Sequence, residues 1–114
     1  MPKFAANLSF LFADVPFSER FKRAAAAGFK GVEYLFPNDF SPQEISGWLN
    51  QNDLEQVLFN LSPGDWASGE RGLACLPRRQ GEFAESVDQA LDYAIHLDCE
   101  RVHCMAGIRP GGHD

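Results

Sequence analysis

Four polar side chains lie near the carboxyl ends of four short apolar segments of this 114-residue chain: Asn7, Glu33, Asn60 and His103. The carboxyl ends of parallel strands meet at one edge of a sheet, and α/β proteins bind their ligands there. These four residues, which we call the rim, predict a binding edge for a small hydroxylated or carboxylated substrate.

Each residue of the rim also has a purely structural interpretation. Asn60 can cap a loop, and Asn7 can hydrogen-bond to a neighbouring strand. A lone histidine such as His103 is more often a satisfied, partly buried side chain than a ligand. Glu33 is the hardest to explain in this way, because a carboxylate within a parallel strand needs a polar partner.

A long connection at residues 61–81 supplies a further candidate, Arg71. Most connections between strands and helices have about 2–6 residues. Trp66 and the apolar Leu73 and Leu76 favour an ordered active-site loop over a floppy insert. A guanidinium binds a carboxylate through two parallel hydrogen bonds, so Arg71 is a candidate receptor for an acidic substrate. A solvated surface arginine is an equal alternative.

The elements that must position these residues alternate along the chain. Gly28 stands where a glycine ends a helix, and Ser41-Pro42-Gln43-Glu44 is a capping box with proline at the first helical position. We expect strands at residues 3–10, 30–36, 54–60 and 100–106, and helices at 17–28, from 41 onward, and at about 82–97. The chain ends in a loop, residues 110–114.

The larger apolar side chains of each strand are expected to face the helices, while small and polar ones face inward. In the first strand the helix-facing residues are Phe4, Leu8 and Phe10. The third helix has an apolar face that we expect to be formed by Phe83, Val87, Ala90, Leu91 and Ala94.

This βαβαβαβ order predicts a parallel sheet with helices packed on it. Right-handed crossovers leave two architectures, an open doubly wound sheet and a closed barrel. The first strand is followed by residues 12–16, F-A-D-V-P, and not by the glycine-rich turn that approaches a pyrophosphate. This counts against a dinucleotide-binding fold.

The net charge is −6, from 10 basic and 16 acidic residues, and the densest basic feature is Arg78-Arg79. A nucleic-acid partner is therefore not expected. Cys75, Cys99 and Cys104 form no C-x-x-C pair, so we expect reduced, partly buried thiols in a cytoplasmic protein. We expect no signal peptide and no membrane span.

Five segments together resemble the hydroxypyruvate isomerase family of xylose-isomerase-like (β/α)₈ barrels. They are FAANLSFLF, GVEYLFP, LFNLSPGD, GERGLACLP and VHCMAG, and they cover essentially the whole chain in the family's order. The resemblance implies the amino-terminal half of such a barrel over residues 1–114, with about four strands in the order 1-2-3-4 and three helices.

The resemblance also implies an activity, the interconversion of hydroxypyruvate and tartronate semialdehyde through an enediol. In that family the two catalytic glutamates and the ligands of a divalent metal, Mg²⁺ or Mn²⁺, sit on strands five to eight. No catalytic or metal-binding residue is therefore expected in this chain, and the fragment is expected to be inactive alone. The resemblance carries over, as substrate-side residues, the four residues of the rim together with Glu70 and Arg71.

Other functions are compatible with the same pattern. A sugar epimerase or another 2-oxo-acid isomerase of the same barrel superfamily is one. A non-catalytic half-barrel that binds a partner chain, or a homo-oligomer, is another, because four strands cannot close a barrel and leave two sheet edges free. The endonucleases of the superfamily are disfavoured by the acidic charge and by only three histidines.

Overall fold

The computed structural model describes residues 2–111 and contains the alternating elements that the sequence predicts. The strands are β1 (Ala5–Asn7), β2 (Gly31–Glu33), β3 (Glu55–Asn60) and β4 (Val102–His103). The helices are α1 (Phe17–Ala26), α2 (Pro42–Gln51) and α3 (Gln80–Leu97), with a short 3₁₀ helix, η1 (Trp66–Ser68), before α3.

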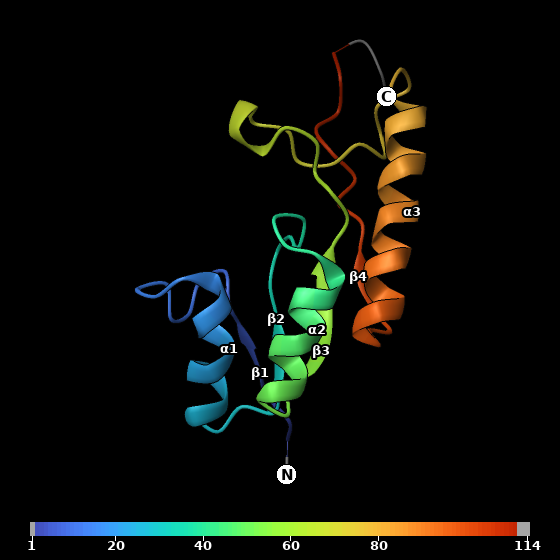
Figure 1. Ribbon diagram of the computed structural model, residues 1–114. Coiled ribbons are helices and arrows are strands. Elements are labelled where there is room, and N and C mark those ends of the chain that lie inside the picture. The colour runs from blue at the N-terminus through green and yellow to red at the C-terminus, as the bar shows by residue number, and fades with distance from the viewer. Residues whose placement is uncertain (1, 112–114) are drawn as a thin grey trace.

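The strands form one parallel sheet in the order β1-β2-β3-β4. The helices lie along one side of it, and the loop that contains η1 rises beyond the carboxyl ends of the strands (Figure 1). The predicted topology of half a parallel barrel is confirmed. Both outer strands pair on one side only, since β1 bonds to β2 and β4 bonds to β3.

The core lies between the sheet and the helices. Val32 of β2 and Tyr34, directly after β2, face the helices and pack with Phe21 of α1. Phe21 is fully buried. Ile45 and Leu49 of α2 complete this layer, and the aromatic ring of Trp48 lies 5.4 Å from that of Phe21. Burial of a large apolar side chain stabilises by about 1.5–3 kcal/mol, so this layer fixes the direction of the strands.

Two helix ends match the predictions from sequence. Gly28 follows the last residues of α1 with φ of 98°, and its N–H donates to the Ala25 carbonyl at 3.0 Å. The hydroxyl of Ser41 accepts from the Glu44 N–H at 3.1 Å, while the Glu44 carboxylate accepts from the Ser41 N–H at 3.3 Å. The capping box is therefore present in both directions.

The first strand is shorter than predicted, and the placement of two of its side chains is wrong. The chain turns directly after Asn7, whose carbonyl accepts from the N–H of Leu11 at 2.9 Å. The Arg20 guanidinium donates to the Leu8 carbonyl at 2.8 Å, so this carbonyl does not bond to a neighbouring strand. Phe10, which lies after the turn, is 68% exposed instead of packing under the helices. Phe4, which precedes β1, is 69% exposed.

The second and fourth strands are also shorter than the ranges 30–36 and 100–106. After His103 the chain leaves β3 and bonds to the long loop, where the Cys75 N–H donates to the Ala106 carbonyl at 2.8 Å. An alternating sequence pattern predicts that a strand is present, but the strand extends only as far as its backbone bonds to a neighbouring strand.

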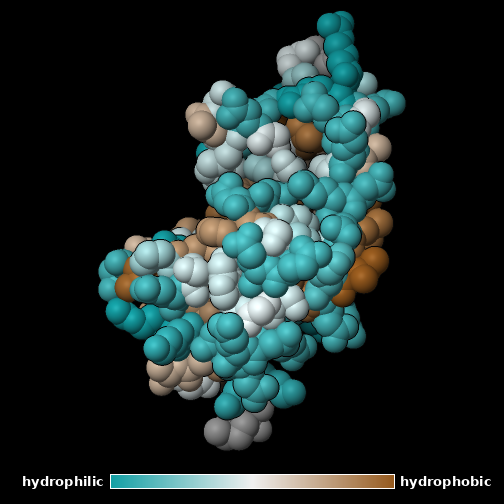
Figure 2. Space-filling view, in the orientation of Figure 1, coloured by the Kyte–Doolittle hydropathy of each residue, from teal (hydrophilic) through white to brown (hydrophobic). Residues whose placement is uncertain are grey.

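The third helix buries most of the predicted face, since Ala90 is buried and Phe83, Val87 and Ala94 are partly buried, but Leu91 is exposed. The buried residues of the helix are Ser86, Ala90, Tyr93 and Leu97. Leu91 follows Ala90 by about 100° around the helix and points away from the sheet. It is 55% exposed, and Ile95 is 78% exposed. Figure 2 shows hydrophobic surface along this side of the molecule.

Two smaller expectations concern the cysteines and membrane spans. All three thiols are free, but Cys75 and Cys104 are exposed and only Cys99 is buried. Burial raises the pKa of the Cys99 thiol above its ordinary value. Within residues 2–111, α1, α2 and α3 are each too short or too polar to cross a bilayer.

Candidate functional site

The four residues of the rim occupy equivalent positions. Asn7, Glu33, Asn60 and His103 are each the last residue of their strand. Parallel pairing sets Asn7 opposite Glu33 and Asn60 opposite His103. The predicted row of polar residues is therefore present as a geometric feature, although the pairing divides it into two couples.

The first couple joins β1 to β2. The Asn7 amide Nδ2 donates to Glu33 Oε1 at 3.5 Å, and Asn7 Oδ1 accepts from the Ser9 N–H at 3.0 Å. Glu33 is only half-buried, and among residues 2–111 it forms no other side-chain hydrogen bond. One carboxylate oxygen is therefore left to accept from a ligand.

The second couple joins β3 to β4. Asn60 Oδ1 lies 3.2 Å from His103 Nδ1. Since an amide oxygen only accepts, this contact requires a proton on Nδ1, and in the neutral imidazole Nε2 is then the acceptor nitrogen. His103 is exposed, so its Nε2 is free to accept from a hydroxyl group of a substrate.

The long loop is ordered by its own polar contacts. Both oxygens of Glu70 are engaged: Oε1 accepts from the Asp65 N–H at 2.6 Å, and Oε2 pairs with the Arg79 guanidinium. The Arg79 ion pair and the Asp65 bond hold the pKa of Glu70 below its usual value. Glu70 thus binds the loop to itself and to the start of α3, and these contacts turn its carboxylate toward protein partners.

Arg71 lies flat on an aromatic ring. Its guanidinium carbon is 3.6 Å from the centre of the Trp66 ring, and the Trp66 ring contacts that of Phe36 with 5.1 Å between centres. Arg71 Nη1 donates to the carbonyls of Trp66 at 3.1 Å and Glu70 at 2.8 Å. Among residues 2–111 these are its only hydrogen bonds, so Nη2 and Nε retain donors for a carboxylate.

The loop also docks on the segment that follows β4. Gly72 has φ of 123°, and a Cβ added there would lie 2.1 Å from the Met105 carbonyl oxygen. A Cβ on Gly107 would meet the Gly72 carbonyl oxygen at 2.6 Å. No side chain fits between these two backbones, which brings Arg71 to the same end of the sheet as His103.

Two hollows of the surface differ in position. One of about 220 Å³ adjoins Arg71 and is lined by Ser68, Glu70, Gly72, Leu76 and Ile108. The other, of about 350 Å³, lies at the opposite end of β3, between the ends of α2 and α3, and contains neither Arg71 nor a residue of the rim. The first hollow includes Arg71 and Glu70 but, like the second, no residue of the rim.

Sequence reasoning did not identify Arg79 and treated Trp66 only as an anchor of the loop. The signal for Arg79 was its spacing from Glu82, three residues later, at the start of a helix. Arg79 indeed bonds Glu82 through two atoms, at 3.0 and 2.6 Å. Nothing local in the sequence indicates its further contact with Glu70, which depends on the course of the loop.

The described residues do not by themselves form a site for a divalent metal. Within residues 2–111, no three His, Cys, Asp or Glu side chains gather in one place. Glu33 of β2 and His103 of β4 are separated by β3, and these two side chains do not provide the near-octahedral set of oxygen ligands that Mg²⁺ prefers. A metal centre therefore does not fit this described part of the chain.

A parallel sheet with helices on one side is the architecture of part of an α/β barrel. The chain belongs to the xylose isomerase-like TIM barrel family, whose sequence model matches residues 21–114. The relationship expected from the five sequence segments is confirmed.

Three relatives show how much of the barrel is present. A 2-oxo-tetronate isomerase of Pectobacterium atrosepticum is 52% identical over 114 residues, which are 100% of this chain and 44% of that protein. The hydroxypyruvate isomerase of Escherichia coli is 46% identical over 112 residues, 98% of this chain and 43% of its own. A crystal structure from Brucella melitensis, described as an AP endonuclease of family 2, matches with a TM-score of 0.95 and 57% identity over 100% of this chain and 44% of that one. The chain spans less than half the length of these relatives.

Proposed function

We propose that this chain is the substrate-binding half of an isomerase that acts on small 2-oxo acids of the hydroxypyruvate type. The observation that carries the proposal is the row of four strand-terminal polar residues with Arg71 at the same end of the sheet. Relatives named hydroxypyruvate isomerase and 2-oxo-tetronate isomerase support it.

The reaction sets the requirements for the site. Hydroxypyruvate loses a proton from its CH₂OH carbon to a base, which forms an enediol across that carbon and the keto carbon. Return of a proton to the former keto carbon, with transfer of the hydroxyl proton between the two oxygens, gives tartronate semialdehyde. No oxidant is consumed, and the site needs a base, a divalent cation or donors for the oxyanion, and a carboxylate receptor.

The residues of this chain meet the binding requirements. His103 Nε2 and the free oxygen of Glu33 accept hydrogen bonds from hydroxyl groups of the substrate, and Asn7 and Asn60 hold these two side chains in place. Arg71 receives the carboxylate through Nη2 and Nε. Glu70 contributes to this site only indirectly, since both of its carboxylate oxygens are engaged by Asp65 and Arg79. The proton-transferring base and the ligands of Mg²⁺ or Mn²⁺ belong to the half of the barrel that this chain does not include.

The direct test uses residues 1–114 alone and joined to the remaining part of the P. atrosepticum relative, which we call the hybrid barrel. Conversion of hydroxypyruvate is followed by NMR with Mg²⁺ or Mn²⁺ added. We expect turnover by the hybrid barrel and none by the chain alone. Turnover by the isolated chain would contradict the placement of the base. A folded hybrid barrel that converts neutral ketoses and ignores 2-oxo acids would favour a sugar epimerase.

A second candidate is a half-barrel that binds a partner chain, including a second copy of itself. The free edges of β1 and β4 favour it, because unpaired strand edges attract further strands. Size-exclusion chromatography with light scattering separates the cases: a well-folded monomer excludes self-pairing. The acidic charge argues against a nucleic-acid partner, and the three free thiols favour the cytoplasm.

A further inference from the structure

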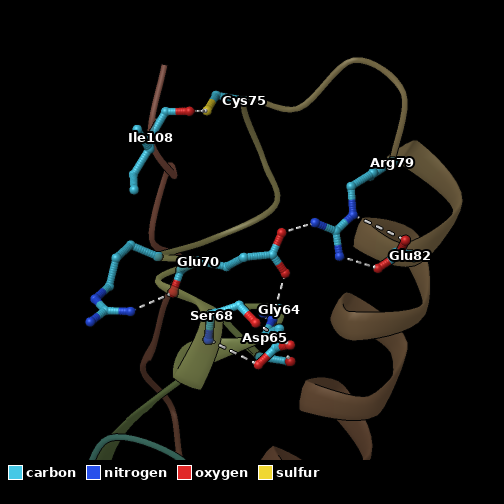
Figure 3. Close-up of polar contacts among 10 residues, drawn as sticks. Gly64, Asp65, Ser68, Glu70, Cys75, Arg79, Glu82 and Ile108 are labelled. Carbon is cyan, nitrogen blue, oxygen red and sulfur yellow. Dashed lines mark hydrogen bonds and ion pairs between the residues drawn. The ribbon is translucent and has the colours of Figure 1, made fainter. Parts of the chain in front are cut away.

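Glu70 and Arg71 are neighbours in sequence, but their side chains meet different partners. The Glu70 carboxylate points toward the start of α3, where it meets Arg79 (Figure 3). The Arg71 guanidinium lies over the ring of Trp66. The position of one side chain therefore constrains the other through two adjacent peptide units.

Arg79 connects the loop to the rigid start of α3. Its guanidinium pairs with Glu70 and also with Glu82, so one cation holds two carboxylates. Both carboxylates have a pKa below their ordinary value because of Arg79. A guanidinium bonded at both of its ends has a fixed orientation, so Glu70 is held at a defined place relative to α3.

Glu70 passes this constraint to the segment under Arg71. Its Oε1 accepts from the Asp65 N–H, and Asp65 in turn caps η1 by accepting from Ser68 N–H at 3.2 Å and from Ser68 Oγ at 2.7 Å. Since η1 begins at Trp66, these bonds fix the ring on which Arg71 rests. The Glu70 carbonyl itself accepts from Arg71 Nη1.

We propose that Arg79, acting through Glu70, positions Arg71 and thereby makes the site selective for substrates that carry a carboxylate. This inference rests on the proposed function, in which Arg71 receives the substrate carboxylate. Arg79 and Glu70 are positioning residues, since their charged groups are occupied by each other and by Asp65 and Glu82. Arg71 contacts the substrate carboxylate, and the ion pair of Arg79 with Glu70 determines the position of Arg71.

The kinetic test compares Arg79→Met with Arg78→Met in the hybrid barrel. Arg78 is an exposed neighbour and serves as the matched control. For Arg79→Met we expect KM for hydroxypyruvate and the Ki of the anionic inhibitor tartronate to rise about tenfold, the scale of a lost charged hydrogen bond. We expect kcat to stay within about twofold, because the reacting carbons are untouched. Inhibition by the neutral analogue glycerol is expected not to change.

A double-mutant cycle tests the route through Glu70. If Arg79 acts on Arg71 only through Glu70, then Glu70→Gln combined with Arg79→Met raises Ki for tartronate no further than either change alone. Arg79→Lys retains the charge and is expected to restore part of the affinity. Additive effects of Glu70→Gln and Arg79→Met would overturn the proposed route.

A measurement without substrate separates this inference from the proposed function. In the chain of residues 1–114, Trp48→Phe leaves Trp66 as the only tryptophan. In this variant we expect Arg79→Met to increase the quenching of Trp66 fluorescence by acrylamide. If the unaltered hybrid barrel fails to bind tartronate while this change is seen, the proposed function fails and the positioning stands. If Arg79→Met changes neither quenching nor the Ki for tartronate, the positioning inference is wrong.

Discussion

Two glutamates at the same end of the sheet, Glu33 and Glu70, have opposite surroundings. Glu33 ends β2 and receives one long hydrogen bond of 3.5 Å from Asn7. Glu70 has both oxygens engaged, by Arg79 and by the Asp65 N–H. A carboxylate whose bonds are all satisfied within the protein holds structure together, whereas one with unused acceptor positions can bind a ligand.

The same contrast separates the rim from the long loop as regions. In the rim, Asn60 and His103 bond to each other and leave Nδ2 and Nε2 unused among residues 2–111. In the loop, hydrogen bonds and close backbone contacts tie residues 63–79 to α3 and to the segment after β4. Arg71 is the exception within the loop, since its free donors make it resemble the rim.

The largest expected effect is on the loop, from Gly72→Ala. A Cβ there would overlap the Met105 carbonyl, and the positive φ adds backbone strain. We expect faster trypsin cleavage after Arg71 and Arg78, and a loss of about 1–3 kcal/mol in the free energy of unfolding in urea. Gly69→Ala is the matched control, because Gly69 has a positive φ of 96° but open space around it. Equal effects of the two changes would show that the loss comes from backbone strain at a positive φ, and not from the contact between the loop and the segment after β4.

The next effect is on the rim, from Glu33→Gln in the hybrid barrel. We expect kcat/KM for hydroxypyruvate to fall about 10- to 100-fold, as for a lost hydrogen bond to a charged group, with the free energy of unfolding changed by less than about 0.5 kcal/mol. Glu55→Gln, at the opposite end of β3, is the control and should leave both quantities unchanged. A large loss of stability in Glu33→Gln would mean that Glu33 resembles Glu70 and has a structural role.

A smaller effect is expected from Ser41→Ala, which removes a local contact far from both the rim and the long loop. Loss of the capping box should lower the free energy of unfolding by about 1 kcal/mol. Activity of the hybrid barrel should not change, because Ser41 lies at the start of α2 and outside the strand-end site. A change in kcat/KM would indicate that the helices and the rim are coupled more strongly than their contacts suggest.

The smallest effect is a local response of the loop to acid. Arg79 holds the pKa of Glu70 below its ordinary value of about 4.3, so the ion pair is complete above that pH and is lost as the pH falls through the lowered value. Asp65 and Glu82, which face the same pair, also have a lowered pKa. Acrylamide quenching of Trp66 in the Trp48→Phe chain should stay constant from about pH 8 to 5 and rise only below about 4.

Glu70→Gln should remove that response, leaving the quenching at its high value throughout. A transition near the ordinary histidine pKa of about 6.5 would instead point to a group outside the Arg79 ion pair.

Prediction from the sequence succeeded where a pattern reports directly on a local contact. The capping box at Ser41, the cap at Gly28 and the order of strands and helices are decided by neighbours within a few residues, and all are present. The positions of Asn7, Glu33, Asn60 and His103 at the strand ends were predicted for a related reason. Each lies in a short segment whose side chains alternate between two faces, and this alternation is a local pattern.

Prediction failed where the partner is distant in sequence. Phe10 alternates correctly for a strand, but Arg20 takes the Leu8 carbonyl and the chain turns away from the sheet. Leu91 lies at the border of the apolar stripe of α3. The packing of α3 on the sheet sets the rotation of the helix, and this rotation leaves Leu91 exposed.

The sequence by itself determined an alternation of parallel strands and helices with a polar row at the strand ends, because periodicity and capping are local. That this sheet is half of a barrel followed from the resemblance of five segments to a known family. Only the tertiary structure decided which polar residues are free to bind a ligand. Glu33 and Glu70 are the same residue type, and the difference between them arises from Arg79, nine positions beyond Glu70, which the fold of the loop brings to one carboxylate and not to the other.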